Sequence, residues 1–197
     1  MDWLAQTIVD TSELTALYPP THPVALAMQI DHLDEHCRAF LASCPFVVLA
    51  STNADGTGDA SPKGGPVGFV RVLDDHHLAL ADLPGNYRLD GLKNIVRNPA
   101  VGLLCLIPGK GETLRINGRG HVVRNEAVLD SCAVGGVRPV TALVVNVREA
   151  FLHCSKAFIR SSLWDQAGWP DIRELASMSC MVHDHMALAG QALEGKA

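Results

Sequence analysis

The sequence has no uninterrupted run of about 18 apolar residues, the length that a membrane-spanning helix needs. Its start, Met1-Asp2-Trp3, lacks the basic stretch and following apolar run that mark a secretion signal. Basic residues are not in excess either: 16 Lys and Arg stand against 21 Asp and Glu, a formal charge of −5. No overall field therefore attracts nucleic acid or anionic lipid. We expect a cytoplasmic protein with neither a nucleic-acid nor a membrane partner.

The cysteines form no C-x-x-C pair that would indicate a zinc knuckle or a redox motif. Several lie inside apolar runs, which is typical of reduced, buried thiols in a reducing compartment. The six are Cys37, Cys44, Cys105, Cys132, Cys154 and Cys180. With 48% hydrophobic and 19% charged residues, the chain has enough apolar material to fold around a core.

Three motifs of common enzyme classes are missing. There is no G-x-G-x-x-G of dinucleotide-binding folds and no P-loop, and the pairs Gly109-x-Gly111 and Gly118-x-Gly120 are typical of turns and close packing. A G-x-S-x-G nucleophile elbow is also absent, so the sequence does not support hydrolysis. The catalytic residues stay unknown at this stage.

One segment resembles a metal motif. His32-Leu33-Asp34-Glu35-His36 has the H-x-x-E-H order of inverted zinc proteases, and histidines four apart share a helix face. Catalytic zinc needs a third protein ligand, and no partner motif follows in the sequence. We interpret the segment as a solvated helix face and predict no metal.

At 197 residues the chain is long enough for one domain with helical additions. Turn-forming residues separate short β-branched runs, and helical periodicity is confined to a few segments. Helices are predicted over residues 11–18, 24–28, 31–43, 88–97 and 126–132, and strands over 46–51, 59–63, 69–73, 78–82, 101–107, 113–123 and 141–147. Hairpin-linked strands predict an antiparallel barrel. We expect an N-terminal helical arm (1–44), a barrel core (45–150) and a C-terminal helical segment (151–197).

Basic residues occur at three places where a phosphate could be held. Ser61-Pro62-Lys63-Gly64 ends a strand, and Asn86-Tyr87-Arg88 opens a helix, whose N-terminus adds N–H donors and a positive dipole end. Arg115, Asn117 and Arg119 alternate along one strand face. Taken one at a time, each segment is better explained as solvated surface. Their joint arrangement favours an anion site.

Several stretches together resemble the pyridoxamine 5′-phosphate oxidase-like FMN-binding proteins. The similar segments are Phe46-Val-Val-Leu-Ala-Ser-Thr, Ala60-Ser-Pro-Lys-Gly, Gly68-Phe-Val-Arg-Val-Leu-Asp-Asp, Leu83-Pro-Gly-Asn-Tyr-Arg, Leu92-Lys-Asn-Ile-Val-Arg-Asn-Pro and Gly111-Glu-Thr-Leu-Arg-Ile-Asn-Gly-Arg. The stretch from Glu149 to Trp164 resembles the C-terminal segment of one bacterial subgroup described only as FMN-binding. Together they cover well over half of the chain.

The resemblance implies a mainly β fold with helices: a six-stranded antiparallel split β-barrel that forms a homodimer, with two FMN sites across the interface. Carried over by position, the flavin-lining strand is Ser61, Pro62, Lys63 and Gly64, and the phosphate-binding turn contains Asn86 and Arg88. Thr113 precedes the R-x-x-G of Arg115 to Gly118 and would lie near the ring. Lys156, Arg160 and Trp164 resemble residues that the second subunit lays over the cofactor.

The end of the chain departs from the true oxidase, which has a substrate-gripping Arg-x-His and a closing Arg-Leu-x-Pro. Neither stands there, and Arg119-Gly-His121 lies in the wrong strand. The leading hypothesis is therefore a flavin-dependent oxidoreductase acting on another small molecule. The alternatives are a non-catalytic FMN or haem binding protein and a barrel that binds a deazaflavin.

Overall fold

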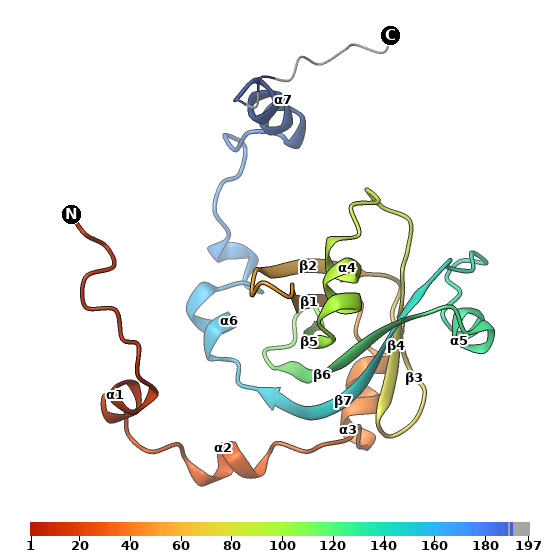
Figure 1. The fold of residues 1–197 in the computed structure, drawn as a ribbon, viewed down its shortest axis with the longest axis horizontal. Helices are drawn as coiled ribbons and strands as arrows, with labels where there is room; N and C mark the ends of the chain where they lie inside the picture. Colours follow the sequence, from red (N-terminus) through yellow and green to blue (C-terminus); the bar gives the residue numbers. More distant parts are fainter. Residues whose placement is uncertain (189, 191–197) are drawn as a thin grey trace. The chain divides into compact units, whose positions relative to one another are not determined.

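The computed structural model describes residues 1–188 and 190 (Figure 1). Its strands are β1 (Phe46–Thr52), β2 (Gly58–Gly64), β3 (Val70–Val72), β4 (His77–Ala81), β5 (Ala100–Leu106), β6 (Thr113–Val123) and β7 (Ala142–His153). Its helices are α1 (Thr11–Ala16), α2 (Pro23–Ala27), α3 (Glu35–Ala42), α4 (Asp90–Arg97), α5 (Glu126–Ser131), α6 (Lys156–Ser161), the 3-10 helix η1 (Gln166–Gly168) and α7 (Met178–Leu188).

The strands form one antiparallel sheet in the order β2-β1-β5-β6-β7-β4-β3. The sheet curves strongly, and its two edge strands, β2 and β3, are not hydrogen-bonded to each other (Figure 1). This is the split-barrel fold that the sequence predicts, and the prediction is confirmed. The sheet has the seven strands that the sequence pattern predicts, including the three-residue β3 paired with β4 at one edge, and so one more than the six implied by the resemblance.

The core fills the concave side of the sheet. Alternate residues of β1 and β5 point inward, so Val47, Leu49, Leu103 and Cys105 are buried while their neighbours are more exposed. Phe40 of α3 joins the same cluster. The period-two burial of these strands is what a sheet with one covered face requires.

The last strand is longer than the sequence predicts. β7 continues through His153, whereas the prediction ended at Val147. A β-bulge explains the difference: Gly118 pairs with Val147, but Asn117 pairs with Glu149, which leaves Arg148 without a partner in the register. The extra residue breaks the alternation of inward and outward side chains, so the pattern in the sequence stops there although the strand does not.

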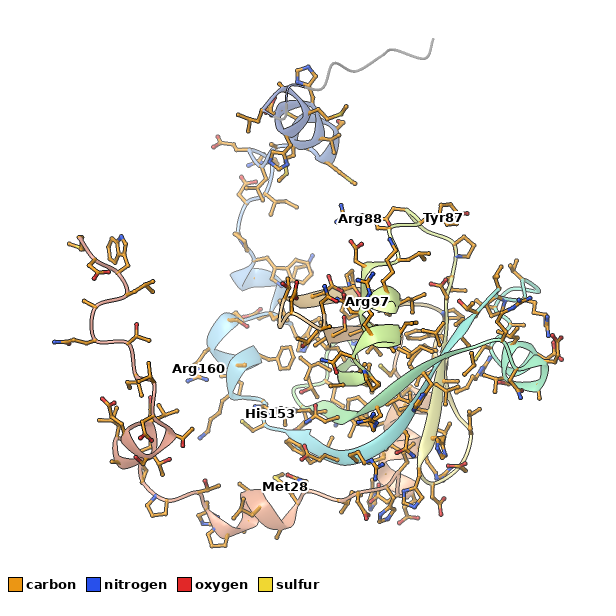
Figure 2. All side chains as sticks on the ribbon, in the orientation of Figure 1. Met28, Tyr87, Arg88, Arg97, His153 and Arg160 are labelled. Carbon is orange, nitrogen blue, oxygen red and sulfur yellow. The ribbon has the colours of Figure 1, made fainter. Side chains whose placement is uncertain are left out.

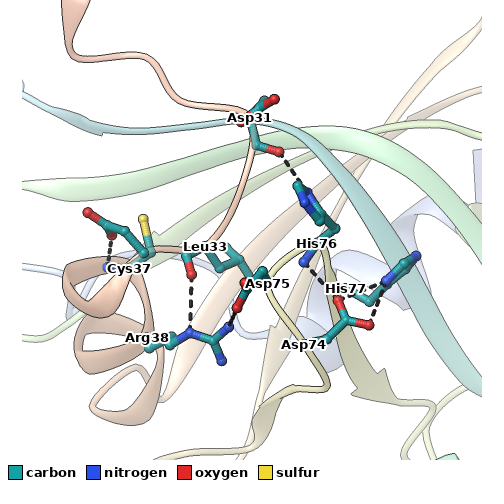
Figure 3. Close-up of polar contacts among 9 residues, drawn as sticks. Asp31, Leu33, Cys37, Arg38, Asp74, Asp75, His76 and His77 are labelled. Carbon is teal, nitrogen blue, oxygen red and sulfur yellow. Dashed lines mark hydrogen bonds and ion pairs between the residues drawn. The ribbon is translucent and has the colours of Figure 1, made fainter.

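Helix α3 is tied to the hairpin between β3 and β4 (Figure 3). Arg38 donates from Nε to the Leu33 carbonyl at 3.1 Å and forms an ion pair with Asp75 of the hairpin. The His76 ring contacts the Asp31 carbonyl oxygen at 3.2 Å. The helix begins at Glu35, four residues later than predicted, because Asp34 is extended and caps it. His32 therefore precedes the helix and does not share a face with His36.

Replacing Asp34 with alanine is expected to lower the free energy of unfolding at pH 7 by about 0.5–2 kcal/mol. Asp34 Oδ1 accepts a hydrogen bond from the Cys37 backbone N–H at 2.8 Å, and this bond lowers the pKa of the carboxyl below its ordinary 3.8. Because the pKa of Asp34 is lower in the folded than in the unfolded chain, the ionised carboxylate stabilises the fold at pH values above its unfolded-state pKa. This stabilisation is lost as the pH falls through the folded-state pKa. Urea unfolding at pH 7 and at pH 3 measures both effects. Asp34→Asn keeps the cap and should keep most of the stability; equal losses in the two variants would contradict the capping role.

The chain divides into two compact units, the first reaching from Met1 to Ala157 and the second beginning at Phe158. Within the first unit, every residue from 1 to 29 is exposed, and α1 and α2 bury nothing. The predicted C-terminal segment, 151–197, spans the junction between the units, and its residues 189 and 191–197 lie outside the described part. No helix among the described residues is both long and apolar enough to cross a membrane.

Candidate functional site

A cavity of about 910 Å³ lies beside α4. Its walls are β2, the loop before α4, the first turns of α4 and the loop before β7. The lining comprises Asp59, Ser61, Lys63, Val96, Arg97, Val122 and the segments 82–93 and 137–141. Figure 2 marks Tyr87 and Arg88 on the loop and Arg97 on the helix. The volume falls within the range typical of small-molecule sites.

Three residues of β2 face this cavity. Asp59, Ser61 and Lys63 are half-buried and line the cavity. Pro62, which separates Ser61 from Lys63, and Gly64, which follows Lys63, are exposed. Successive side chains of a strand point to opposite sides, so the strand presents the first three to the cavity and the other two to the opposite side. Of the four residues predicted for the flavin strand, Ser61 and Lys63 therefore line the cavity, and Pro62 and Gly64 do not.

The loop before α4 has an unusual backbone. Tyr87 and Leu89 both have left-handed conformations, with φ of 57° and 59°, on either side of Arg88. Asn86 Oδ1 accepts a hydrogen bond from the Arg88 N–H at 3.1 Å, which closes a turn. The helix consequently begins at Asp90, not at Arg88 as predicted, and Arg88 stands in the loop ahead of it. Non-glycine residues held in this region are concentrated at ligand sites.

Cationic residues outnumber anionic ones in the lining of the cavity, although one of them, Arg138, is paired with Glu126 and Asp130 outside the lining. The cationic residues of the lining are Lys63, Arg88, Lys93, Arg97 and Arg138, against the anionic Asp59, Asp82 and Asp90. Arg88 donates from Nε to Asp90 Oδ2 at 2.8 Å, and Lys93 Nζ donates to the Arg88 carbonyl at 2.8 Å. The N-terminal turn of α4 opens at the same place and adds backbone donors. The arrangement can hold an anion such as a phosphate.

Polar side chains lie where α4 packs on β1 and β2. Asn94 donates to Ser51 Oγ at 3.3 Å, and Ser51 pairs with Asp59 across β1 and β2. Asp59 Oδ2 and Ser61 Oγ are buried and have no hydrogen-bond partner in the described part of the chain. Buried polar atoms are normally hydrogen-bonded, so these two oxygens, which lie beneath Gly91 of α4, are exceptions.

Residues 33–154 match the family model described as pyridoxamine 5′-phosphate oxidase. The chain belongs to this family. No curated protein is similar enough in sequence to count as a match.

Solved structures to which this chain is similar come from several bacteria. A proposed pyridoxamine 5′-phosphate oxidase of Lactobacillus delbrueckii is 22% identical, over 62% of this chain and 95% of its own, with a TM-score of 0.48. HupZ of Group A Streptococcus is 18% identical over 58% and 90%, with a TM-score of 0.46. HutZ of Vibrio cholerae, a haem storage protein, is 13% identical over 62% and 94%, with a TM-score of 0.41.

Five further residues predicted from the family resemblance do not line the cavity. Thr113 is buried at the start of β6, opposite His153 of β7. Arg115 is exposed on β6, and its guanidinium lies 5.5 Å from the centre of the Phe151 ring. The other three come after the barrel: Lys156 begins α6, Arg160 lies near its end, and Trp164 stacks on Phe158 with ring centres 5.5 Å apart. Their role over a second subunit's cofactor stays a prediction.

The sequence analysis missed several residues of the cavity. Asp59 has the same parity as Ser61 and Lys63 along β2, so strand alternation alone could have identified it. Lys93 and Arg97, four apart on α4, could have been found from helical spacing. No local signal identifies Arg138, because a loop distant in the sequence brings it to the cavity.

Metal ligands are not gathered anywhere in residues 1–188 and 190: no group of three or more His, Cys, Asp or Glu side chains is arranged to hold an ion. His36 lies 3.7 Å from Glu35 and is exposed, and His32 contacts its neighbour Asp31 at 3.0 Å.

Proposed function

We propose that the chain binds FMN in the cavity beside α4 and is a flavin-dependent oxidoreductase acting on an unidentified small molecule. One observation carries the proposal: the cavity joins Ser61 and Lys63 of β2 with Asn86 and Arg88 of the loop before α4. These four are among the six residues that the family resemblance assigns to the flavin strand and the phosphate-binding turn.

The side chains present fit a flavin nucleotide. A phosphate monoester carries between one and two negative charges, and Arg88 offers it a planar fork of donors while Lys63 offers a point charge. The backbone N–H groups in the first turn of α4, which have no partner within the helix, would donate to the same phosphate. Apolar residues such as Leu83, Val96 and Val140 complete the walls, as expected around a flat ring system.

Bound FMN would supply the hydride or electron transfer. The chain's own residues would bind the phosphate, keep water from the apolar walls and leave one side of the cavity for a substrate. The sequence shows no set of side chains arranged for acid or base chemistry, and hydride transfer to or from a flavin does not require one.

We further propose a homodimer with the FMN sites at the interface. Phe46 and Leu104 are exposed on the convex side of neighbouring strands, next to half-buried Val48 and Leu106. An apolar sheet face of this kind is normally covered by another chain.

The six cysteines are all free thiols, which supports the reducing cytoplasm as the location.

The test is the spectrum, mass and stoichiometry of the cofactor that accompanies the purified full-length chain, together with sedimentation. We expect flavin absorption, one FMN per chain, a dimer at micromolar concentration, and bleaching by a nicotinamide nucleotide without oxygen. A Soret band would indicate that the cofactor is haem. A cofactor with the mass of a deazaflavin would show that the barrel binds a deazaflavin and not FMN. FMN that is never reduced by any donor would indicate a binding protein, and a stable monomer would contradict the shared sites.

A further inference from the structure

Residues 1–29, the exposed arm, carry apolar side chains and bury none of them. Every residue of the exposed arm is exposed, and neither of its helices has a buried residue. At least 65% of the surface is exposed in five of its large apolar side chains: Trp3, Leu4, Val9, Leu17 and Tyr18. Apolar side chains gathered in this way normally mark a surface that another molecule covers.

The two helices of the exposed arm are too short to be stable alone. α1 has six residues and α2 has five, whereas an isolated helix of fewer than about 12–15 residues is marginal in water. Both nevertheless begin at a capping side chain. Asp10 accepts a hydrogen bond from the Ser12 N–H at 2.7 Å, and His22 caps α2 in the same way. The sequence thus encodes two helices that need a covering surface to stabilise them.

The charge of the exposed arm argues against an anionic lipid surface as its partner. Its charged side chains are Asp2, Asp10 and Glu13, and the first Lys or Arg in the sequence is Arg38. Helices that lie on anionic lipid carry Lys and Arg on their polar face. A protein surface that combines apolar side chains with unpaired cations matches the exposed arm better.

The outer face of the sheet, opposite the core, is such a surface. Directly paired residues of neighbouring strands share a face, so one band of side chains crosses four strands. From β1 to β7, this outer band consists of Val48, Leu104, Arg115 and Phe151. Arg115 and Arg119 are exposed on the same side of β6, and neither is paired with a carboxylate in the described part of the chain.

The exposed arm starts from a fixed point at the edge of this sheet. The Ile30 N–H donates to the Ala150 carbonyl oxygen at 3.0 Å, and the Ala150 N–H donates to the Ile30 carbonyl oxygen at 2.8 Å. From there the exposed arm can reach on the order of 60 Å. Four neighbouring strands span only about 15 Å. The exposed arm is therefore long enough to leave its own barrel and cross the outer face of another.

We propose that the exposed arm docks on the outer band of a second copy of the chain, and that the two copies exchange arms. Its apolar side chains cover Val48 and Leu104, and its carboxylates lie near Arg115. The occupant is a second copy because the exposed arm can reach its own outer band, yet none of residues 1–29 is buried in the single chain. Two-fold symmetry makes the exchange reciprocal. The proposal rests on the homodimer of the proposed function and names the part of the partner that covers this face.

The first experiment tests the contact directly. The photocrosslinking residue benzoylphenylalanine replaces Leu17 in the full-length chain, and the irradiated protein is separated under denaturing conditions. We expect a covalent product of twice the mass of one chain, whose linked peptides, identified by mass spectrometry, join residues 1–29 to β1, β5 or β6. Links within single chains only would place the exposed arm on its own barrel and overturn the proposal. Links to a different face of the second copy would overturn it as well.

Val67 provides the matched control for this experiment. It is 67% exposed, against 65% for Leu17, and lies in the loop between β2 and β3. Benzoylphenylalanine at Val67 should give no covalent dimer with the outer band. Equal yields from the two positions would mean that the product comes from random collisions.

The second experiment measures the dimer dissociation constant by sedimentation. Leu17→Ser should raise it by about a hundredfold, because burying one leucine is worth about tenfold in affinity and the dimer contains the contact twice. Val67→Ser should leave the dissociation constant unchanged. Losses of the same size in both variants would contradict a contact made by the exposed arm.

The outcomes separate this proposal from the proposed function. A stable dimer that neither cross-links through Leu17 nor responds to Leu17→Ser would overturn the exchanged arms and leave the dimer standing. A monomer would remove both the shared FMN sites and the exchanged arms. Cross-linked dimers without FMN would support the exchange and refute the cofactor. Binding to phosphatidylserine vesicles that Leu17→Ser abolishes would assign the exposed arm to a membrane and overturn the proposal.

Discussion

Replacing Arg88 with alanine should weaken FMN binding by about ten- to hundredfold and leave riboflavin binding almost unchanged. Riboflavin has the same ring and ribityl chain but no phosphate. Arg88 lies beside the N-terminal turn of α4, so its guanidinium and the free N–H groups can converge on one anion. Its side chain is three-quarters exposed, so removing it should not disturb the fold.

Fluorescence titration of apoprotein with the two flavins measures the difference. Arg173→Ala is a suitable control, since Arg173 is also exposed and pairs with an aspartate two residues away, Asp171. It lies outside the cavity, so neither affinity should change. Equal losses of FMN and riboflavin affinity in the Arg88 variant would show that Arg88 does not contact the phosphate.

Replacing Gly118 with alanine should have the largest effect on stability, a loss of about 1–3 kcal/mol or more in the free energy of unfolding. At the β-bulge between β6 and β7, a Cβ on Gly118 would lie 2.2 Å from the Asn146 carbonyl oxygen. That neighbour is backbone within a sheet, so it cannot move aside as a flexible side chain would. Paired strands would have to separate to admit the methyl group.

Urea unfolding midpoints of the wild type and the variant test this expectation. Gly58→Ala is the matched control, because Gly58 is also a strand glycine, but a Cβ added there would meet no other atom within 4 Å. Its effect should stay within about 0.5 kcal/mol. Similar losses in the two variants would mean that the close contact at the bulge is relieved at no cost.

Most of the fold follows from local patterns in the sequence. Alternation and turn residues predict β6 with its observed bounds, residues 113–123, and place the two hairpins β1-β2 and β3-β4 within a few residues. The prediction fails where geometry breaks a pattern: the bulge at Arg148 hides the second half of β7, and the left-handed Leu89 delays the start of α4. Leu89 has no local signature, because a left-handed residue there is not a glycine. The bulge depends on Gly118 of the neighbouring strand β6, so the sequence of β7 alone does not reveal it.

The candidate site is predictable to a similar extent. Ser61, Lys63, Asn86 and Arg88 were found from strand ends, turn residues and the family resemblance, and the cavity contains all four. Arg138 could not be found, because its place at the cavity depends on which distant segments pack together. Thr113 and Arg115 share β6 and lie elsewhere on the barrel.

The pairing of β1 with β5 has a consequence for how the cavity forms. Ser51 lies opposite Val101, and the chain between them contains β2, the loop before α4 and α4 itself, which are three of the four walls. Closing so long a loop is entropically costly and slow compared with forming a hairpin. A ligand that binds between β2 and α4 needs this closure first, so its binding energy retards unfolding much more than it hastens folding.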